Sequence, residues 1–208
     1  MSDLIIIGAS GHAKVLADIA IKNGYTIFGF LDDNENVSEV LGYKRLGKVS
    51  DCLKYKDACD FVIGIGNNAV RKKIAEEYWQ LNYVTLIHPS ASIGLNVKID
   101  IGTVVMPMSV INSCATIGRH SIINSGAVVE HDCNVGDFCL IASRSTLCGV
   151  VKIGNNVHID AGSVINKVLY VCDNVTVDAG SVVAENITES GFYAGSPAKN
   201  IMTEGQMK

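Results

Sequence analysis

The chain has 208 residues, with 17 Lys and Arg against 21 Asp and Glu and a formal net charge of −4. This length suffices for one large domain or two small domains, each with its own hydrophobic core. The mildly acidic balance and the lack of a basic run argue against nucleic-acid binding, so we expect no nucleic-acid partner.

No stretch of the sequence approaches the roughly 18 apolar residues of a membrane-spanning helix. The apolar stretch from Leu4 to Ile7 is too short for the core of a signal peptide and lacks a basic leader. The seven cysteines include no CxxC pair and are typical of reduced thiols rather than of a disulfide framework. We therefore expect no membrane insertion and a cytoplasmic location.

Residues 1–86 alternate short apolar runs with amphipathic helical patterns. An apolar run at residues 4–8 precedes a helical pattern at residues 12–23, and two strand-like segments, YTIFGFLDD and DFVIGIG, follow. A second helical pattern, NNAVRKKIAEEYWQL, comes next. This order of strands and helices predicts a small parallel sheet covered by helices, a Rossmann-like α/β domain.

From Ile93 onwards the helical patterns disappear, and an aliphatic residue returns at every sixth position. The sixteen members of this series are Ile93, Ile99, Val105, Ile111, Ile117, Ile123, Val129, Val135, Ile141, Leu147, Ile153, Ile159, Ile165, Val171, Val177 and Val183. Two residues before each member lies a second, mostly small residue. One bulky and one small inward residue in every six predict a flat strand followed by a corner.

Three such sides would close a triangular coil of about 18 residues. The sequence shows this longer period directly, because DAGSVI at residues 160–165 returns as DAGSVV at residues 178–183. The pattern predicts a parallel β-helix with about five coils over residues 93–183, within a domain that spans residues 87–208 and ends in a C-terminal cap. We expect the repeated residues, including Cys133 and Cys139, to be structural, and function to lie in residues that project from the repeat.

His131 is the most promising of the five histidines for catalysis. It lies between Glu130 and Asp132, and a neighbouring carboxylate can raise the basicity of an imidazole and fix its tautomer. Gly149 follows one coil later and leaves space for a ligand over the ring. The alternative is that His131 is an exposed residue without a role.

His120 and His158 lack such neighbours, and we expect both on the surface. A zinc site of the γ-carbonic-anhydrase type needs three converging histidines. The spacings between His120, His131 and His158 do not match that family, so we expect no metal.

The segment GASGH at residues 8–12 follows a strand and precedes a helix, where backbone N–H groups can bind an anion. It is an incomplete G-x-G-x-x-G fingerprint, and a packing role is the alternative. Asp32 and Asp33 end the second strand and are candidates to accept hydrogen bonds from a base or ribose, unless they only form a turn.

Several motifs together resemble the hexapeptide-repeat sugar O- and N-acetyltransferases. This family includes the bacillosamine-pathway UDP-4-amino-sugar N-acetyltransferase, the perosamine N-acetyltransferase and the sialic acid O-acetyltransferases. The motifs are GASGHAKV, LDDN, IGIGNNAVRKKI, IHPSASIG, VVEHDCNVGDF and GFYAGSPAKNI, and they extend over nearly the whole chain. The resemblance implies a left-handed β-helix and a homotrimer with acetyl-CoA bound between neighbouring helices.

The resemblance also assigns roles to individual residues. It implies that His131 is the general base and Asp132 its helper, with Glu130 as the reserve candidate. The implied acetyl-CoA contacts are Leu140, Ala161 and Ala179, and Gly149 adjoins them. Ala161 and Ala179 lie one coil apart, as a column of small residues along which a pantetheine arm can extend.

Leu140 departs from the family, whose members often have a histidine there, and His158 one coil later is the candidate substitute. The implied nucleotide-sugar contacts are Ser10, Gly11, His12, Asp32, Asp33 and Gly66, with Asn67 next to them.

The sequence therefore predicts direct acetyl transfer to the amino group of a nucleotide-linked amino sugar, with His131 accepting the proton. One alternative keeps this chemistry but transfers the acetyl group to a sugar hydroxyl. Another is a nucleotide-sugar-binding protein without catalysis, for which Leu140 is the hint. The nucleotide, UDP, GDP or dTDP, stays open at this point.

Overall fold

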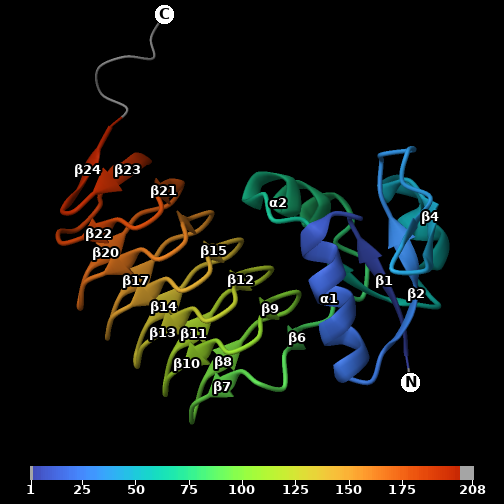
Figure 1. Ribbon diagram of the computed structural model, residues 1–208, viewed down its shortest axis with the longest axis horizontal. Helices are drawn as coiled ribbons and strands as arrows, with labels where there is room; N and C mark the ends of the chain where they lie inside the picture. Colours follow the sequence, from blue (N-terminus) through green and yellow to red (C-terminus); the bar gives the residue numbers. More distant parts are fainter. Residues whose placement is uncertain (1, 202–208) are drawn as a thin grey trace, which may run out of the picture. The chain divides into compact units, whose positions relative to one another are not determined.

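The computed structural model describes residues 2–201, and the chain divides into two compact units, Met1–Pro89 and Ser90–Lys208. Figure 1 shows the helices and the twisted sheet of the first unit and the stacked coils of the second. No helix within residues 2–201 is long and apolar enough to cross a membrane.

The first unit contains a five-stranded sheet with the strand order β3-β4-β2-β1-β5. Its strands are β1 (Asp3–Ile7), β2 (Thr26–Leu31), β3 (Glu39–Val40), β4 (Tyr43–Gly47) and β5 (Asp60–Ile63). The remaining elements are α1 (Gly11–Lys22), the 3-10 helix η1 (Val49–Tyr55), α2 (Asn68–Glu77) and β6 (Leu86–Ile87). β1 pairs in parallel with both β2 and β5, as expected for a Rossmann-like unit.

Burial explains why these segments form the core of the unit. Residues Leu4 to Ile7 of β1 are fully buried, which fits a central strand of a parallel sheet. α1 packs against β1 and β2 through its apolar face, which includes Leu16 and Ile19. Gly64 permits this close approach, because a Cβ there would lie 2.8 Å from the Cβ of Ala13.

The second unit is a left-handed parallel β-helix with three flat sides. Side 1 contains β7 (Ser92–Ile93), β10 (Val110–Ile111), β13 (Val128–Val129), β16 (Thr146–Leu147), β19 (Val164–Ile165) and β22 (Val182–Val183). Side 2 contains β8 (Lys98–Ile99), β11 (Thr116–Ile117), β14 (Asn134–Val135), β17 (Lys152–Ile153) and β20 (Tyr170–Val171). Side 3 contains β9 (Val104–Val105), β12 (Ile122–Ile123), β15 (Leu140–Ile141), β18 (His158–Ile159), β21 (Val175–Val177), β23 (Gly191–Gly195) and β24 (Ala198–Asn200).

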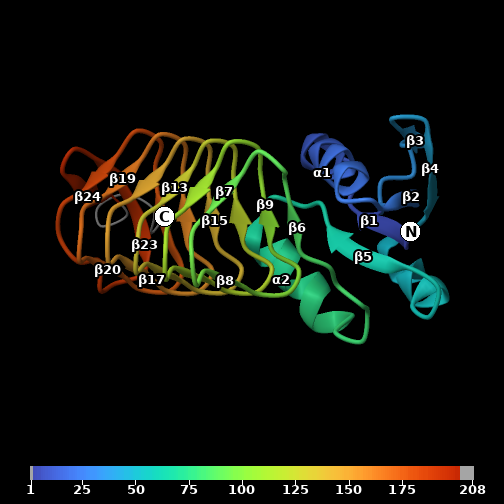
Figure 2. The same cartoon turned by 90° about the horizontal axis from the view of Figure 1, so that it is seen from below.

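Strands of one side stack in register, each on the strand one coil earlier (Figure 2). Val128 pairs with Thr146 and Leu140 pairs with His158, both in parallel. The expected 18-residue coil is therefore confirmed. The last coil is covered by β23 and β24, which pair antiparallel with each other.

The aliphatic series lines the interior of the β-helix, as expected. Its members are buried from Val105 onwards, and so are Cys133 and Cys139 of the small series. Ile93 is an exception, with 38% of its surface exposed, and Ile99 is half-buried. Both belong to the first coil of the unit, where β7 pairs only with β10 within this side.

One corner of the coil is held by a ladder of side chains along the helix. Asn155 accepts the N–H of Asp137 and Asp173 accepts the N–H of Asn155, each at 2.8 Å. Gly136 allows the coils to approach here, because a Cβ at this position would lie 2.6 Å from the carbonyl oxygen of Gly154. The recurring Ile-Gly or Val-Gly pairs of the repeat are therefore a packing requirement.

The expectation that His120 lies on the surface is wrong. Its side chain is only 5% exposed and stacks on the ring of Phe138, with centroids 5.4 Å apart and ring planes 3° from parallel. The backbone of His120 is left-handed, with a φ of 51°, and the ring lies over Gly102 of the preceding coil. His158, in contrast, keeps about a third of its side chain exposed.

Candidate active site

His131 lies at the corner that follows β13 and precedes β14, where its side chain is exposed. Its Nδ1 is 2.7 Å from Oδ2 of Asp132, whose backbone is left-handed with a φ of 59°. Because a carboxylate can only accept, Nδ1 carries the proton that is shared with Asp132. Nε2 is then the unprotonated nitrogen, with a lone pair that can accept a proton from a ligand.

Gly149 lies directly over the His131 ring, as its one-coil offset predicts. A Cβ at Gly149 would lie 2.7 Å from Nε2 and 2.9 Å from Cε1 of His131. The main chain keeps the two coils in register, with the N–H of Val150 bonded to the carbonyl oxygen of His131 at 3.0 Å. The missing side chain therefore lets the His131 ring pack against the backbone of Gly149, rather than leaving the expected space for a ligand over the ring.

The side chain of Glu130 is hydrogen-bonded to Asn112 and not to His131. Its Oε2 accepts a hydrogen bond from Nδ2 of Asn112 at 2.8 Å, one coil earlier. The hydrogen bond to the His131 ring comes from Asp132 instead. The geometry therefore favours Asp132 over Glu130 as the group that orients His131.

The candidate cofactor residues belong to another part of the coil. Leu140 lies on side 3, with His158 above it in register. Ala161 and Ala179 are exposed at the corner between sides 3 and 1, one coil apart. His131 lies instead at the corner between sides 1 and 2. One chain therefore does not bring the His131 corner and the alanine column together.

The two alanines differ in what they offer a ligand. The N–H of Ala161 donates to Oδ1 of Asp160 at 2.7 Å, and its carbonyl oxygen accepts from Gly180 at 2.9 Å. Ala179 makes no hydrogen bond within residues 2–201. Of the two, Ala179 is the one whose backbone can bond to an extended ligand.

In the first unit, Asp32 shapes the GASGH turn. Its Oδ2 accepts the N–H of Ala9 at 2.7 Å, and its Oδ1 accepts the N–H of Asn34 at 2.8 Å. Both carboxylate oxygens therefore stabilise local backbone. Ser10 and Gly11, which begin α1, stay exposed beside this turn.

Asp33 has a different structural role from Asp32. Its Oδ1 accepts the N–H of Val49 at 2.9 Å, the first residue of η1. A carboxylate at the start of a helix satisfies a backbone donor that has no intrahelical partner. Asp33 therefore ties the end of β2 to η1.

His12 and Arg71 meet beside the same turn. Burial and, to a smaller extent, the nearby charge of Arg71 together lower the pKa of His12 to about 4, so the ring is neutral at pH 7. Its Nε2 is buried and makes no hydrogen bond within the described residues. Sequence reasoning missed Arg71, a charged side chain only 1% exposed on α2.

The loop before α2 depends on the same arginine. Arg71 donates to the carbonyl oxygens of Ile65 and Gly66 at 3.0 and 2.9 Å. Asn67 caps α2, because its Oδ1 accepts the N–H of Val70 at 3.0 Å. The N-termini of α1 and α2 therefore follow the carboxyl ends of the neighbouring strands β1 and β5, an arrangement that suits an anion.

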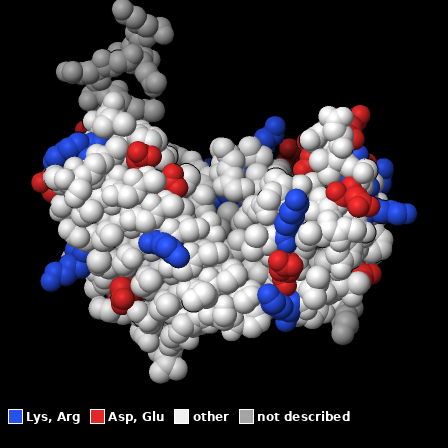
Figure 3. Space-filling model, in the orientation of Figure 1, with Lys and Arg blue, Asp and Glu red and all other residues white. Residues whose placement is uncertain are grey.

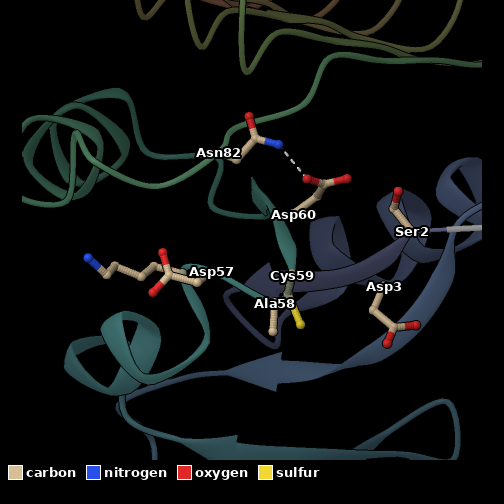
Figure 4. Close-up of a pocket in the computed structure, with 8 residues that line it drawn as sticks. Ser2, Asp3, Asp57, Ala58, Cys59, Asp60 and Asn82 are labelled. Carbon is tan, nitrogen blue, oxygen red and sulfur yellow. Dashed lines mark hydrogen bonds between the residues drawn. The ribbon is translucent and has the colours of Figure 1, made fainter.

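A separate polar pocket of about 330 Å³ lies at the other end of these strands, next to Ser2, Asp3, Asp57, Asp60 and Asn82 (Figure 4). Asp60 and Asn82 are hydrogen-bonded to each other there. The pocket contains none of the expected site residues.

Within residues 2–201, no three His, Cys, Asp or Glu side chains are placed to hold a metal ion.

Charge is spread thinly over the face of the molecule that Figure 3 draws. On the face drawn in Figure 3, Lys and Arg side chains are separated by broad uncharged areas or lie next to Asp and Glu. Within this view there is no continuous basic patch of the kind that binds a nucleic-acid backbone.

Comparison with known proteins agrees with both units. Residues 3–78 match the PglD N-terminal domain, and residues 132–167 match the bacterial transferase hexapeptide (six repeats). The acetyltransferase domain of PglB from Neisseria gonorrhoeae FA1090 is 32% identical, with a TM-score of 0.92, and the match covers 97% of this chain and 100% of that domain.

Two further relatives are informative. PerB from Caulobacter crescentus, solved in complex with CoA and GDP-perosamine, is 30% identical with a TM-score of 0.91, covering 96% of this chain and 97% of that one. The UDP-N-acetylbacillosamine N-acetyltransferase of Bacillus subtilis is 35% identical over 121 residues, which are 51% of this chain and 52% of that protein. The match spans 52% of that protein's length, 59% of the GDP-perosamine N-acetyltransferase of Escherichia coli O157:H7 and 24% of protein L142 of Acanthamoeba polyphaga mimivirus.

The fold and the two family matches define a hexapeptide-repeat transferase with an α/β unit at its N-terminus. The extent of the similarity then fixes the family. The chain belongs to the left-handed β-helix sugar acetyltransferases that include the PglB acetyltransferase domain and PerB.

Proposed function

We propose that this chain transfers the acetyl group of acetyl-CoA to the amino group of a nucleotide-linked amino sugar, with His131 as the general base. The observation that carries the proposal is the His131 ring, whose Nδ1 is bonded to Oδ2 of Asp132 at 2.7 Å, so that Nε2 is the nitrogen left to accept a proton. The relatives support the substrates, since PerB was solved with CoA and GDP-perosamine and the Neisseria domain with acetyl coenzyme A.

His131 has one task in this reaction. As the sugar nitrogen bonds to the acetyl carbon and the carbon–sulfur bond breaks, Nε2 accepts a proton from the nitrogen and passes it to the departing thiolate. Asp132 holds the tautomer and stabilises the protonated ring. The chain needs no covalent acetyl-enzyme, and turnover of acetyl-CoA with amino-sugar nucleotides tests the proposal.

We further propose that the first unit binds the nucleotide, with the GASGH turn at the phosphates. The N-termini of α1 and α2 support an anion here. His12 is neutral at pH 7 and presents an unpaired Nε2 near the turn. The hydrogen bonds of Asp32 and Asp33 indicate that these carboxylates act chiefly by shaping the backbone.

Asp32 and Asp33 therefore form a matched pair for mutation. Asp32→Ala leaves the N–H groups of Ala9 and Asn34 without their acceptor, and a loss of about 1 to 3 kcal/mol corresponds to a 5- to 150-fold weaker nucleotide affinity. Asp33→Ala removes the acceptor for Val49 and should lower the free energy of unfolding by about 1 kcal/mol with little effect on nucleotide affinity.

Competition of free UDP, GDP and dTDP with the sugar substrate measures the nucleotide affinity of each variant. Thermal unfolding measures the change in its stability. The KM for acetyl-CoA is the internal control and should not change in either variant. Equal losses of nucleotide affinity in the Asp32 and Asp33 variants would contradict this assignment.

We also propose a homotrimer, as the family resemblance implies. The alanine column runs parallel to the axis of the β-helix, since Ala179 lies one coil above Ala161, and His131 is at another corner of the same chain. An arm that lies along Ala161 and Ala179 can reach His131 only if a neighbouring chain supplies it. Cyclic symmetry repeats such a contact in every chain.

This arrangement predicts complementation between two inactive variants. His131→Ala removes the base, and Ala179→Trp blocks the column. When both variants are co-expressed in equal amounts, about a quarter of the sites should combine an intact histidine with an intact column from different chains. Recovery of activity in the mixed trimer, isolated by two tags, is the expected result. No recovery in a mixed trimer would place both elements in one chain, and sedimentation of an active monomer would contradict the trimer.

The cytoplasmic location expected from the sequence stays a prediction.

A further inference from the structure

Glu130 is a charged group beside the base that the proposed reaction does not use. Asp132 rather than Glu130 bonds to His131. Glu130 is half-buried, and its Oε2 is held by Nδ2 of Asn112 at 2.8 Å. Its Oε1 makes no hydrogen bond within residues 2–201.

Glu130 has different neighbours in the coil below it and in the coil above it. In the coil below, Asn112 fixes one carboxylate oxygen. In the coil above, the register of Val129 with Leu147 places Cys148 over Glu130, next to Gly149 over His131. Two small residues therefore follow the acid and the base in the coil above, and Glu130 and His131 are adjacent residues at the same corner of the β-helix.

We propose that Glu130, oriented by Asn112, binds the acceptor amine in its ammonium form and thereby selects amino sugars over their hydroxyl analogues. This inference rests on the proposed function of the site. An alkyl amine is largely protonated at neutral pH, as the lysine side chain is. A partly buried carboxylate attracts that charge, whereas a neutral hydroxyl gains only an ordinary hydrogen bond.

The protons balance along this route. The bound ammonium first releases one proton to water, which exposes the lone pair of the nitrogen. The nitrogen then attacks the acetyl carbon, and a second proton passes to Nε2 of His131 and from there to the departing thiolate. Glu130 contributes to binding and orientation and carries no proton itself.

The test compares two ligands on matched variants without acetyl-CoA. Calorimetry would measure the affinity for an amino-sugar nucleotide and for the nucleotide sugar with a hydroxyl in place of the amine. Glu130→Gln keeps an oxygen that can accept from Asn112 but removes the charge. We expect it to weaken amine binding by about 10- to 150-fold, the range for a hydrogen bond to a charged group, and to leave hydroxyl binding unchanged.

Two further variants distinguish binding of the ammonium group by Glu130 from a role in assisting His131. Asn112→Ser loosens the carboxylate and should reduce the preference for the amine in part. Asp132→Asn keeps the charge of Glu130 and should lower kcat while the preference stays at the wild-type ratio.

If Glu130→Gln weakened the binding of both ligands equally, or left the preference for the amine unchanged, the inference would be overturned. The proposed function would still stand in that case, provided that the wild type acetylated amino sugars. A loss confined to kcat would do the same and would make Glu130 a helper of His131. A wild type that acetylated no amino-sugar nucleotide would overturn the proposed function itself, and the inference with it.

Discussion

Replacing His131 by alanine is expected to lower kcat by about 10²- to 10⁴-fold, the usual contribution of a positioned general base. The ring is exposed and outside the aliphatic core, so the β-helix should fold as before. His131→Asn should lose activity as well, because an amide cannot accept the proton at this pH. Initial rates of CoA release at saturating acetyl-CoA measure the effect.

His158→Ala is the matched control for this prediction. His158 is also an outward-facing histidine of the β-helix, but it lies on side 3, away from the His131 corner. We expect its kcat to remain near that of the wild type, with any change confined to the KM for acetyl-CoA. A His131→Ala variant that retained more than half of the wild-type turnover would refute the assignment of the base.

Gly149→Ala is expected to lower kcat by about 10²-fold, because displacement of a catalytic group by about 1 Å has a cost of this size. The added Cβ would lie 2.7 Å from Nε2 of His131 and must push the ring aside. Gly149 is not among the residues with a positive φ, so alanine fits its backbone. Stability should therefore change little, and thermal unfolding checks this.

A double mutant separates displacement of the ring from other effects. If the alanine acts by moving His131, adding Gly149→Ala to His131→Ala should reduce the residual rate by less than about twofold, since interacting sites are not additive. A further large loss in the double mutant would show instead that Gly149 leaves room for the substrate. Full activity of the single Gly149→Ala variant would contradict both explanations.

The β-helix was predictable because its core repeats. An aliphatic residue at every sixth position places one inward side chain on each side of the coil, and the structure buries that series from Val105 onwards. The corners were less predictable, because their residues adopt left-handed backbone. His120 shows the consequence, since its φ of 51° turns the ring over the preceding coil and out of solvent.

In the first unit, sequence patterns identified the parallel strands β1, β2 and β5 and both helices, but not the shorter elements. The short pair β3 and β4 and the 3-10 helix η1 have no clear hydrophobic period, and they depend on long-range contacts. One of these is the hydrogen bond from the N–H of Val49 to Asp33, and another joins Arg45 to the carbonyl oxygen of Asp32. Such contacts between distant residues are not visible in local spacing.

The candidate site was predictable to a similar degree. The 18-residue offset placed Gly149 over His131, and the structure shows this contact. Asn112 lies one coil before Glu130 by the same rule, but nothing in the sequence indicated that their side chains bond. Arg71 is buried but was missed, because an arginine followed directly by Lys72 and Lys73 has no distinctive pattern in the sequence.

Incubation of the chain with acetyl-CoA and a panel of UDP-, GDP- and dTDP-linked amino sugars tests the central claim most directly. Each amino sugar should be paired with its hydroxyl analogue, and the products identified by mass spectrometry and NMR. The account predicts that one nucleotide series gives a product with a single acetyl group on the sugar nitrogen, together with stoichiometric CoA. Acetylation of the hydroxyl analogues alone, or no CoA release with any member of the panel, would contradict it.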